Sequence, residues 1–125
     1  MTAHGGTGVL RLFKATLNSW NGLRAATRSE EAFRQEIIAL LVAIPAAFLV
    51  ATDMWRRIAL IGVIVLLMIV ELLNTAIEKL SDHVTPHHHD AIGRIKDMAS
   101  AAVGLSLLLA GLVWVIALAE RVGLL

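Results

Sequence analysis

Three long apolar stretches constrain this chain more than any other feature, because each is close to the length that crosses a lipid bilayer. They are expected as helices at 32–51, 58–82 and 98–119. Hydrophobic residues make up 58% of the sequence, and the mean hydropathy is +0.76. A soluble domain is usually about half apolar or less. The sequence therefore predicts an all-α membrane protein with three transmembrane helices, in a single domain over residues 1–125.

An amphipathic segment at 8–28 precedes these spans. Its apolar residues recur at helical spacing, with basic residues between them: Val9, Leu12, Phe13, Leu17, Trp20 and Leu23. The segment is too polar to cross a membrane, so we expect a surface helix in the membrane interface with its basic side toward water. A helix that only packs against the protein is the less favoured interpretation. Met1–Thr7 is expected to lack regular structure.

Polar residues mark where the predicted spans begin and end. Ser29 is a suitable N-cap for the first span, and the acidic Glu30 and Glu31 suit its first turn. A turn at 52–57 and a loop at 85–90 separate the spans. Trp114, near the outer end of the third span, is expected to face lipid.

Basic residues are divided unequally between the two sides of the predicted bundle. One side has Arg11, Lys14, Arg24, Arg28, Arg34, Lys79, Arg94 and Lys96. The other has Arg56, Arg57 and Arg121. The positive-inside rule then places the N-terminal helix in the cytoplasm and the C-terminus outside.

Composition also limits the partners. The net charge is +1 and the basic residues are scattered, so nothing indicates nucleic-acid binding. Cysteine is absent, which excludes disulfides and thiolate chemistry. Three helices cannot easily shield several charges from lipid, and Ala102, Ser106 and Ala110 follow a small-xxx-small pattern. We therefore expect an oligomeric bundle.

A stripe of polar residues continues the second span. Glu71, Asn74 and Glu78 lie at i, i+3 and i+7, so they share one helix face, which Asp82 extends. The helical rise from Ile58 places Glu71 about 20 Å across the core. A charge deep in a membrane costs roughly 2.5–3.5 kcal/mol, so such a residue is a functional candidate. The alternative is a glutamate retained only for packing.

These residue types suit phosphoryl transfer. Magnesium prefers one or two carboxylates plus phosphate oxygens and water, which Glu78 and Glu30 could supply. Lys96 could neutralise phosphate charge, and Asp97 could position that lysine. Glu71 could accept a proton from a lipid hydroxyl. The phosphate-binding loops of soluble kinases are missing. Three consecutive histidines, 87–89, cannot converge on one ion, so a solvated loop is favoured there.

Three runs carry a resemblance to a known family. GLRAATRSEEAFRQE (22–36), ELLNTAIEKLSD (71–82) and GRIKDMASAAV (93–103) resemble the prokaryotic integral-membrane diacylglycerol kinases of the Gram-negative type. The resemblance extends from about Val9 into the third span. It implies a homotrimer with shared active sites that transfers the γ-phosphate of ATP to diacylglycerol, using Mg²⁺ and giving phosphatidic acid. It also implies a multi-pass protein of the bacterial inner membrane, with a cytoplasmic active site and a periplasmic C-terminus.

The resemblance also assigns roles to residues. Glu71 would be the general base, and Glu30 and Glu78 would hold the metal. The ATP-binding residues would be Arg11, Asn18, Glu30, Asn74, Glu78, Lys96 and Asp97. The residues that line the lipid or support the site would be Ser19, Trp20, Arg24, Arg34, Gln35, Glu36, Arg57 and Ser100. Asn18 departs from the family pattern, because well-known members carry a tyrosine there.

Alternatives remain open on the sequence alone. Gram-positive relatives phosphorylate undecaprenol, and lipid choice depends on the shape of a pocket. A small proton-coupled transporter would also use a buried acid such as Glu71. However, 63–70 offers no polar path to the outer side. An assembly subunit without catalysis would leave the polar stripe unexplained.

Overall fold

The computed structural model of the chain describes residues 7–125. They form four helices: α1 (Gly8–Ser29), α2 (Glu31–Val50), α3 (Met54–Val84) and α4 (Asp90–Arg121). Three of them, α2, α3 and α4, are long and apolar enough to cross a membrane. The predicted all-α membrane architecture is therefore confirmed. The expectation that Met1–Thr7 lacks regular structure falls outside the described residues, except at Thr7. Thr7 is the N-cap of α1, and its Oγ1 accepts a hydrogen bond from the Leu10 amide (3.4 Å).

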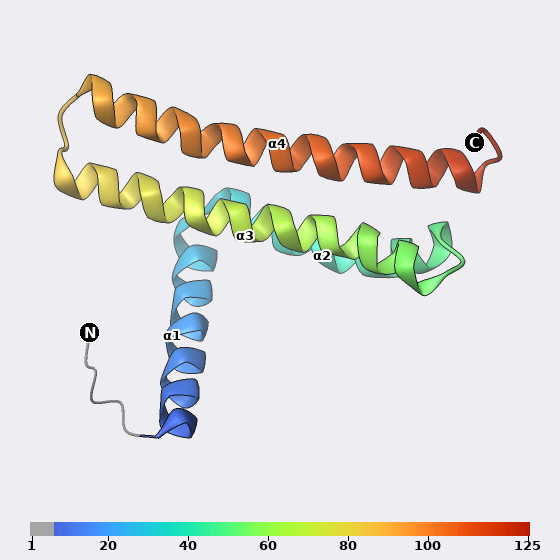
Figure 1. The fold of residues 1–125 in the computed structure, drawn as a ribbon, viewed down its shortest axis with the longest axis horizontal. Helices are drawn as coiled ribbons and strands as arrows, with labels where there is room; N and C mark the ends of the chain where they lie inside the picture. The colour runs from blue at the N-terminus through green and yellow to red at the C-terminus, as the bar shows by residue number, and fades with distance from the viewer. Residues whose placement is uncertain (1–6) are drawn as a thin grey trace.

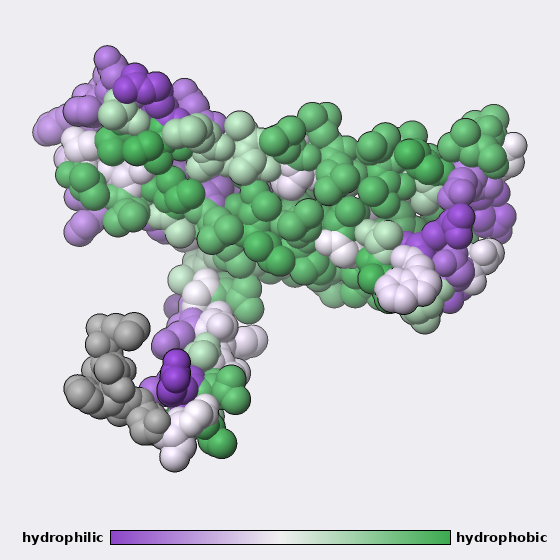
Figure 2. Space-filling model, in the orientation of Figure 1, coloured by the Kyte–Doolittle hydropathy of each residue, from purple (hydrophilic) through white to green (hydrophobic). Residues whose placement is uncertain are grey.

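The three membrane-length helices run side by side, and α1 leaves them crosswise (Figure 1). The central helix is α3, which packs against both α2 and α4. A helix that is perpendicular to the spans lies in the plane of the membrane. Hydrophobic side chains cover the middle of the bundle and hydrophilic ones gather at its two ends (Figure 2). This distribution suits a protein whose middle is surrounded by lipid.

The crosswise direction of α1 originates at Glu30, the one residue between α1 and α2. Its backbone is extended, with φ −115° and ψ 113°. The prediction that Ser29 caps α2 is wrong. Helical hydrogen bonding continues to the Glu30 amide, which donates to Ala26 O (2.8 Å), so Ser29 remains inside α1. Its hydroxyl donates to the Glu30 carboxylate (3.0 Å) instead of accepting a hydrogen bond from an amide of α2.

Both connections between spans are shorter than predicted. Asp53 caps α3 by accepting from the Arg56 amide (3.3 Å), so the helix begins at Met54. The Arg56 side chain also donates to Asp53, which lowers the pKa of that carboxyl group. At the other end, His89 Nδ1 accepts from the Ala91 amide (3.2 Å), and α4 begins at Asp90.

Small side chains let the helices approach closely. Ala47 is completely buried and packs with Leu60 and Ala117, one residue from each of the three long helices. The expectation that Trp114 faces lipid is corrected by this cluster. Trp114 packs against it and donates its indole N–H to Leu60 O (3.0 Å), because a half-buried indole needs an acceptor. Of the small-residue pattern on α4, Ser106 and Ala110 are buried, whereas Ala102 is exposed.

Replacing Ala47 with leucine should destabilise the bundle by about 1–3 kcal/mol, because the added carbons have no space where the three helices meet. Denaturation of the purified protein in micelles, followed by circular dichroism, measures this change. Ala39→Leu is the matched control, since Ala39 is exposed on the same helix. An equal loss of stability in both variants would contradict the packing argument.

Candidate functional site

Glu71 is the most buried acidic residue in the described part of the chain. Only 8% of it is exposed, on the face of α3 that also carries Asn74 and Glu78. Asn74 Nδ2 donates to Glu78 Oε1 (3.0 Å), which fixes the orientation of that carboxylate. A buried carboxylate needs a neutralising partner or a chemical role.

Three further carboxylates lie near enough to Glu71 to affect its charge. Those of Glu30 and Glu78 are close enough to interact electrostatically with it, and so is that of Glu36 on α2. Two acceptor atoms of this group, Glu36 Oε1 and Asn74 Oδ1, are buried and have no hydrogen-bond partner within residues 7–125. Buried polar atoms are ordinarily paired. The group is therefore suited to a cation or a hydrogen-bond donor that comes from outside the chain.

The fit of this group to a metal ion can be judged from its donor atoms. Within the described part of the chain, no three histidine, aspartate or glutamate side chains form a cluster that could hold an ion. Magnesium in nucleotide sites takes only one or two carboxylates, plus phosphate oxygens and water. Glu30 already attracts a cation, because Lys79 Nζ lies 3.7 Å from its Oε2. Glu30 and Glu78, which both interact electrostatically with Glu71, offer two carboxylates, the number that such a nucleotide site takes.

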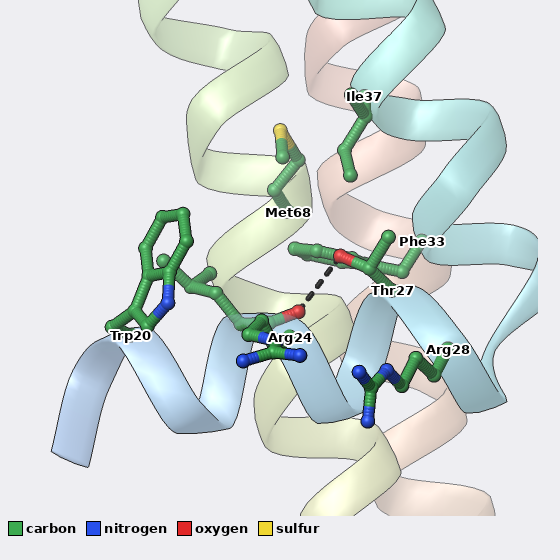
Figure 3. Close-up of a pocket in the computed structure, with 8 residues that line it drawn as sticks. Trp20, Arg24, Thr27, Arg28, Phe33, Ile37 and Met68 are labelled. Atoms are coloured by element: carbon green, nitrogen blue, oxygen red, sulfur yellow. Dashed lines mark hydrogen bonds between the residues drawn. The ribbon is translucent and has the colours of Figure 1, made fainter. Parts of the chain in front are cut away.

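A cavity of about 440 Å³ lies where α1 meets α2 and α3. Its lining is mostly apolar: Trp20, Leu23, Arg24, Thr27, Arg28, Phe33, Ile37 and Met68. Figure 3 shows Trp20, Arg24 and Arg28 on the α1 side, with Met68 and Ile37 on the two spans. Met68 precedes Glu71 by three residues, so both lie on one face of α3. The cavity therefore adjoins the acidic group.

Two of the predicted lipid-lining residues, Trp20 and Arg24, line this cavity. Arg34 supports it indirectly. Its Nη1 donates to the carbonyls of Thr27 (2.9 Å) and Arg28 (3.1 Å) at the end of α1. Those carbonyls have no partner of their own within a helix. Arg34 thus ties α2 to the last turn of α1 and holds the cavity wall in place.

Other predicted site residues make contacts elsewhere or are exposed. Lys96 forms an ion pair with Asp82, near the ends of α4 and α3. Arg57 lies at the opposite end of α3, about 21 Å from Glu71 by the helical rise. There its Nε donates to Ala51 O (3.1 Å), and its guanidinium stacks on Phe48. Several more are exposed on their helices: Arg11, Asn18, Ser19, Gln35, Asp97 and Ser100.

The prediction from sequence missed Lys79 and most of the cavity. Lys79 contacts Glu30 and Ser29, residues that are far from it in the chain. Only the packing of α2 on α3 brings them together, so no spacing in the sequence signals the contact. Met68 was easier to find, because it lies one turn before the buried Glu71 on an apolar face.

The architecture is that of a small polytopic membrane protein, with an acidic group and a cavity where a crosswise helix meets the spans. Residues 17–118 match the family model described as prokaryotic diacylglycerol kinase. The chain therefore belongs to the prokaryotic diacylglycerol kinase family, as the resemblance of its three runs predicted.

Individual relatives cover nearly the whole chain. The diacylglycerol kinase of Escherichia coli (strain K12) is 44% identical over 121 residues, which are 97% of this chain and 99% of that protein. The diacylglycerol kinase of Pseudomonas aeruginosa is 42% identical over 110 residues, covering 88% of this chain and 89% of that protein. The diacylglycerol kinase of Haemophilus influenzae is 36% identical over 108 residues, or 86% and 92% of the two chains.

Arg34→Lys should loosen the junction of α1 and α2, because the lysine side chain is one atom shorter and its ammonium group does not reach the position of the arginine nitrogen that donates to both carbonyls. Losing one such hydrogen bond should raise local opening by about two- to five-fold. Hydrogen exchange at the amides of residues 27–30 measures this effect. Arg94→Lys on α4 is the matched control and should leave those amides unchanged. Unaltered exchange in Arg34→Lys would show that the two bonds do not hold the junction.

Proposed function

We propose that this chain is a magnesium- and ATP-dependent diacylglycerol kinase that produces phosphatidic acid. One observation carries the proposal: the buried Glu71 lies among acidic side chains and beside a mostly apolar cavity. A lipid alcohol and a metal-bound phosphate need these two environments side by side. The relatives described above are all diacylglycerol kinases, which supports the choice of substrate.

The lipid would enter at the cavity under α1. Its apolar lining suits the acyl region, and Trp20 and Arg24 lie at the level of the glycerol backbone if α1 rests in the interface. The mouth of the cavity is formed by α1, α2 and α3, so the acyl chains can extend into the bilayer. The hydroxyl group would then point along α3 from Met68 toward Glu71.

The triphosphate would bind on the other side of Glu71, toward the end of α3. Glu30 and Glu78 would hold the magnesium ion, which supplies neutralising charge for the β- and γ-phosphates. Asn74 keeps Glu78 oriented through its 3.0 Å hydrogen bond. Lys96, with Asp97 beside it, could add positive charge from α4 after leaving its partner Asp82. Arg11 and Asn18 of α1 would contribute only to the outer part of the nucleotide.

Glu71 would act as the general base. It accepts the proton of the lipid hydroxyl as the alcohol oxygen bonds to the γ-phosphorus and the bond to ADP breaks. Burial excludes water from this position, which limits competing hydrolysis of ATP.

The assembly and the membrane are part of the same proposal. A homotrimer in the bacterial inner membrane, with its N-terminus and active site cytoplasmic, would agree with the distribution of basic residues. The buried oxygens of Glu36 and Asn74 that lack partners support a site that is completed from outside the chain. In such a trimer, Gln35 and Ser100 would line the lipid path or contact a neighbouring subunit.

The direct test is purified protein in micelles with magnesium, ATP and a short-chain diacylglycerol, scored for phosphatidic acid. We expect product that requires both diacylglycerol and the metal and disappears when the metal is chelated. Undecaprenol in place of diacylglycerol should give much less product. Faster transfer to undecaprenol would identify undecaprenol as the substrate instead of diacylglycerol. Transfer to neither lipid would overturn the proposal.

Glu71→Gln should reduce lipid phosphorylation by about 10²–10⁴-fold, because the amide cannot accept the proton. The variant should remain folded and inserted, since glutamine keeps the size of the side chain. Initial rates of phosphatidic acid formation at saturating ATP measure the loss. Glu31→Gln, at an exposed acid beside Glu30, serves as the control. Turnover near the wild-type rate in Glu71→Gln would remove Glu71 as the base.

A further inference from the structure

Lys79 has no part in the reaction described above, yet its ammonium group lies beside a carboxylate assigned to the metal. Its Nζ is 3.7 Å from Glu30 Oε2 and donates to Ser29 Oγ at 3.3 Å. The Ser29 hydroxyl donates to the same glutamate oxygen at 3.0 Å. These three groups form a closed ring that joins the end of α1 and the start of α2 to α3.

Lys79 follows Glu78 directly in the sequence, but the two side chains point in different directions from α3. Successive side chains on a helix point about 100° apart. Glu78 accepts a hydrogen bond from Asn74, while Lys79 reaches the α1–α2 junction. The Lys79 side chain is 61% exposed and that of Glu30 only 27%. The lysine can therefore swing into water, whereas the carboxylate stays in place.

We propose that Lys79 is a positioning residue that occupies the cation position at Glu30 in the absence of metal and competes with the divalent ion for it. This inference rests on the proposed function, because it takes Glu30 to be a metal ligand. An ammonium group and a divalent ion repel each other, so each weakens the binding of the other at the same carboxylate oxygen. Metal binding therefore releases Lys79 from Glu30 and Ser29.

The competition has two consequences for the site. In the metal-free state, Lys79 offsets one of the negative charges around Glu71 and keeps the Glu30 carboxylate oriented toward α3. In the metal-bound state, its long side chain is free. An exposed ion pair of this kind is weak, so removing it should tighten metal binding only about two- to five-fold.

The test is a titration of the full-length protein in micelles with Mn²⁺ at a fixed, saturating concentration of a non-hydrolysable ATP analogue, because the proposed metal arrives with the nucleotide. Protein-bound Mn²⁺ is measured by electron paramagnetic resonance. Lys79→Met should bind Mn²⁺ about two- to five-fold more tightly than the wild type. Lys79→Arg, which keeps the charge, should bind like the wild type. Lys14→Met removes a charge from exposed α1 and is the matched control, with no expected change. Lys79→Gln is a second variant without the charge and should behave like Lys79→Met. Circular dichroism checks that each variant keeps its helices.

A double-mutant cycle tests whether the effect passes through Glu30. In a Glu30→Gln background, Lys79→Met should leave Mn²⁺ affinity unchanged, because the shared carboxylate is gone. Equal affinities of Lys79→Met and the wild type would overturn the proposal. So would an equal gain in Lys14→Met, or no Mn²⁺ binding by any variant.

The two proposals fail separately. If the wild type makes no phosphatidic acid but Lys79→Met still binds Mn²⁺ more tightly, the proposed function falls and the competition at Glu30 stands. If the wild type is active and the affinities are equal, only the role of Lys79 falls.

Discussion

The cost of leaving a backbone amide or carbonyl unpaired in lipid governs this structure. Inside a bilayer such groups must be satisfied within the helix, so the chain can break only at the levels of the two membrane surfaces. The break at Glu30 follows this rule. One extended residue turns α1 out of the bundle, and the carbonyls left open at the end of α1 are taken up by Arg34. The cavity and the acidic group both lie at this break.

Packing and electrostatics are divided between the two ends of the bundle. At the end of the bundle near the α2–α3 turn, alanines and Leu60 bring the helices together, and the Trp114 indole joins α4 to α3 through the Leu60 carbonyl. Toward the other end, carboxylates from α2, α3 and the α1–α2 junction share one region around Glu71. Packing at one end thus holds the helices whose acidic groups repel one another at the other end, and a cation from outside the chain would relieve that repulsion.

The sequence predicted what depends on helical period and length, and missed what depends on contacts between helices. The apolar runs and the i, i+3, i+7 spacing of Glu71, Asn74 and Glu78 required only single-helix geometry. Ser29 was misread because a capping residue can equally end one helix as begin the next. Trp114 was misread because its acceptor, Leu60 O, belongs to another helix. The Lys79–Glu30 contact was invisible for the same reason.

The length of α3 has a consequence of its own. Its 31 residues span about 46 Å, whereas the hydrocarbon layer is only about 30 Å thick. The helix therefore emerges from the lipid without interruption, and in Figure 1 the paired ends of α3 and α4 extend past the level of α1. One continuous helix thus has one part in the hydrocarbon layer and another part in water. The same helix that anchors the chain in the membrane therefore also presents side chains to the water beyond it.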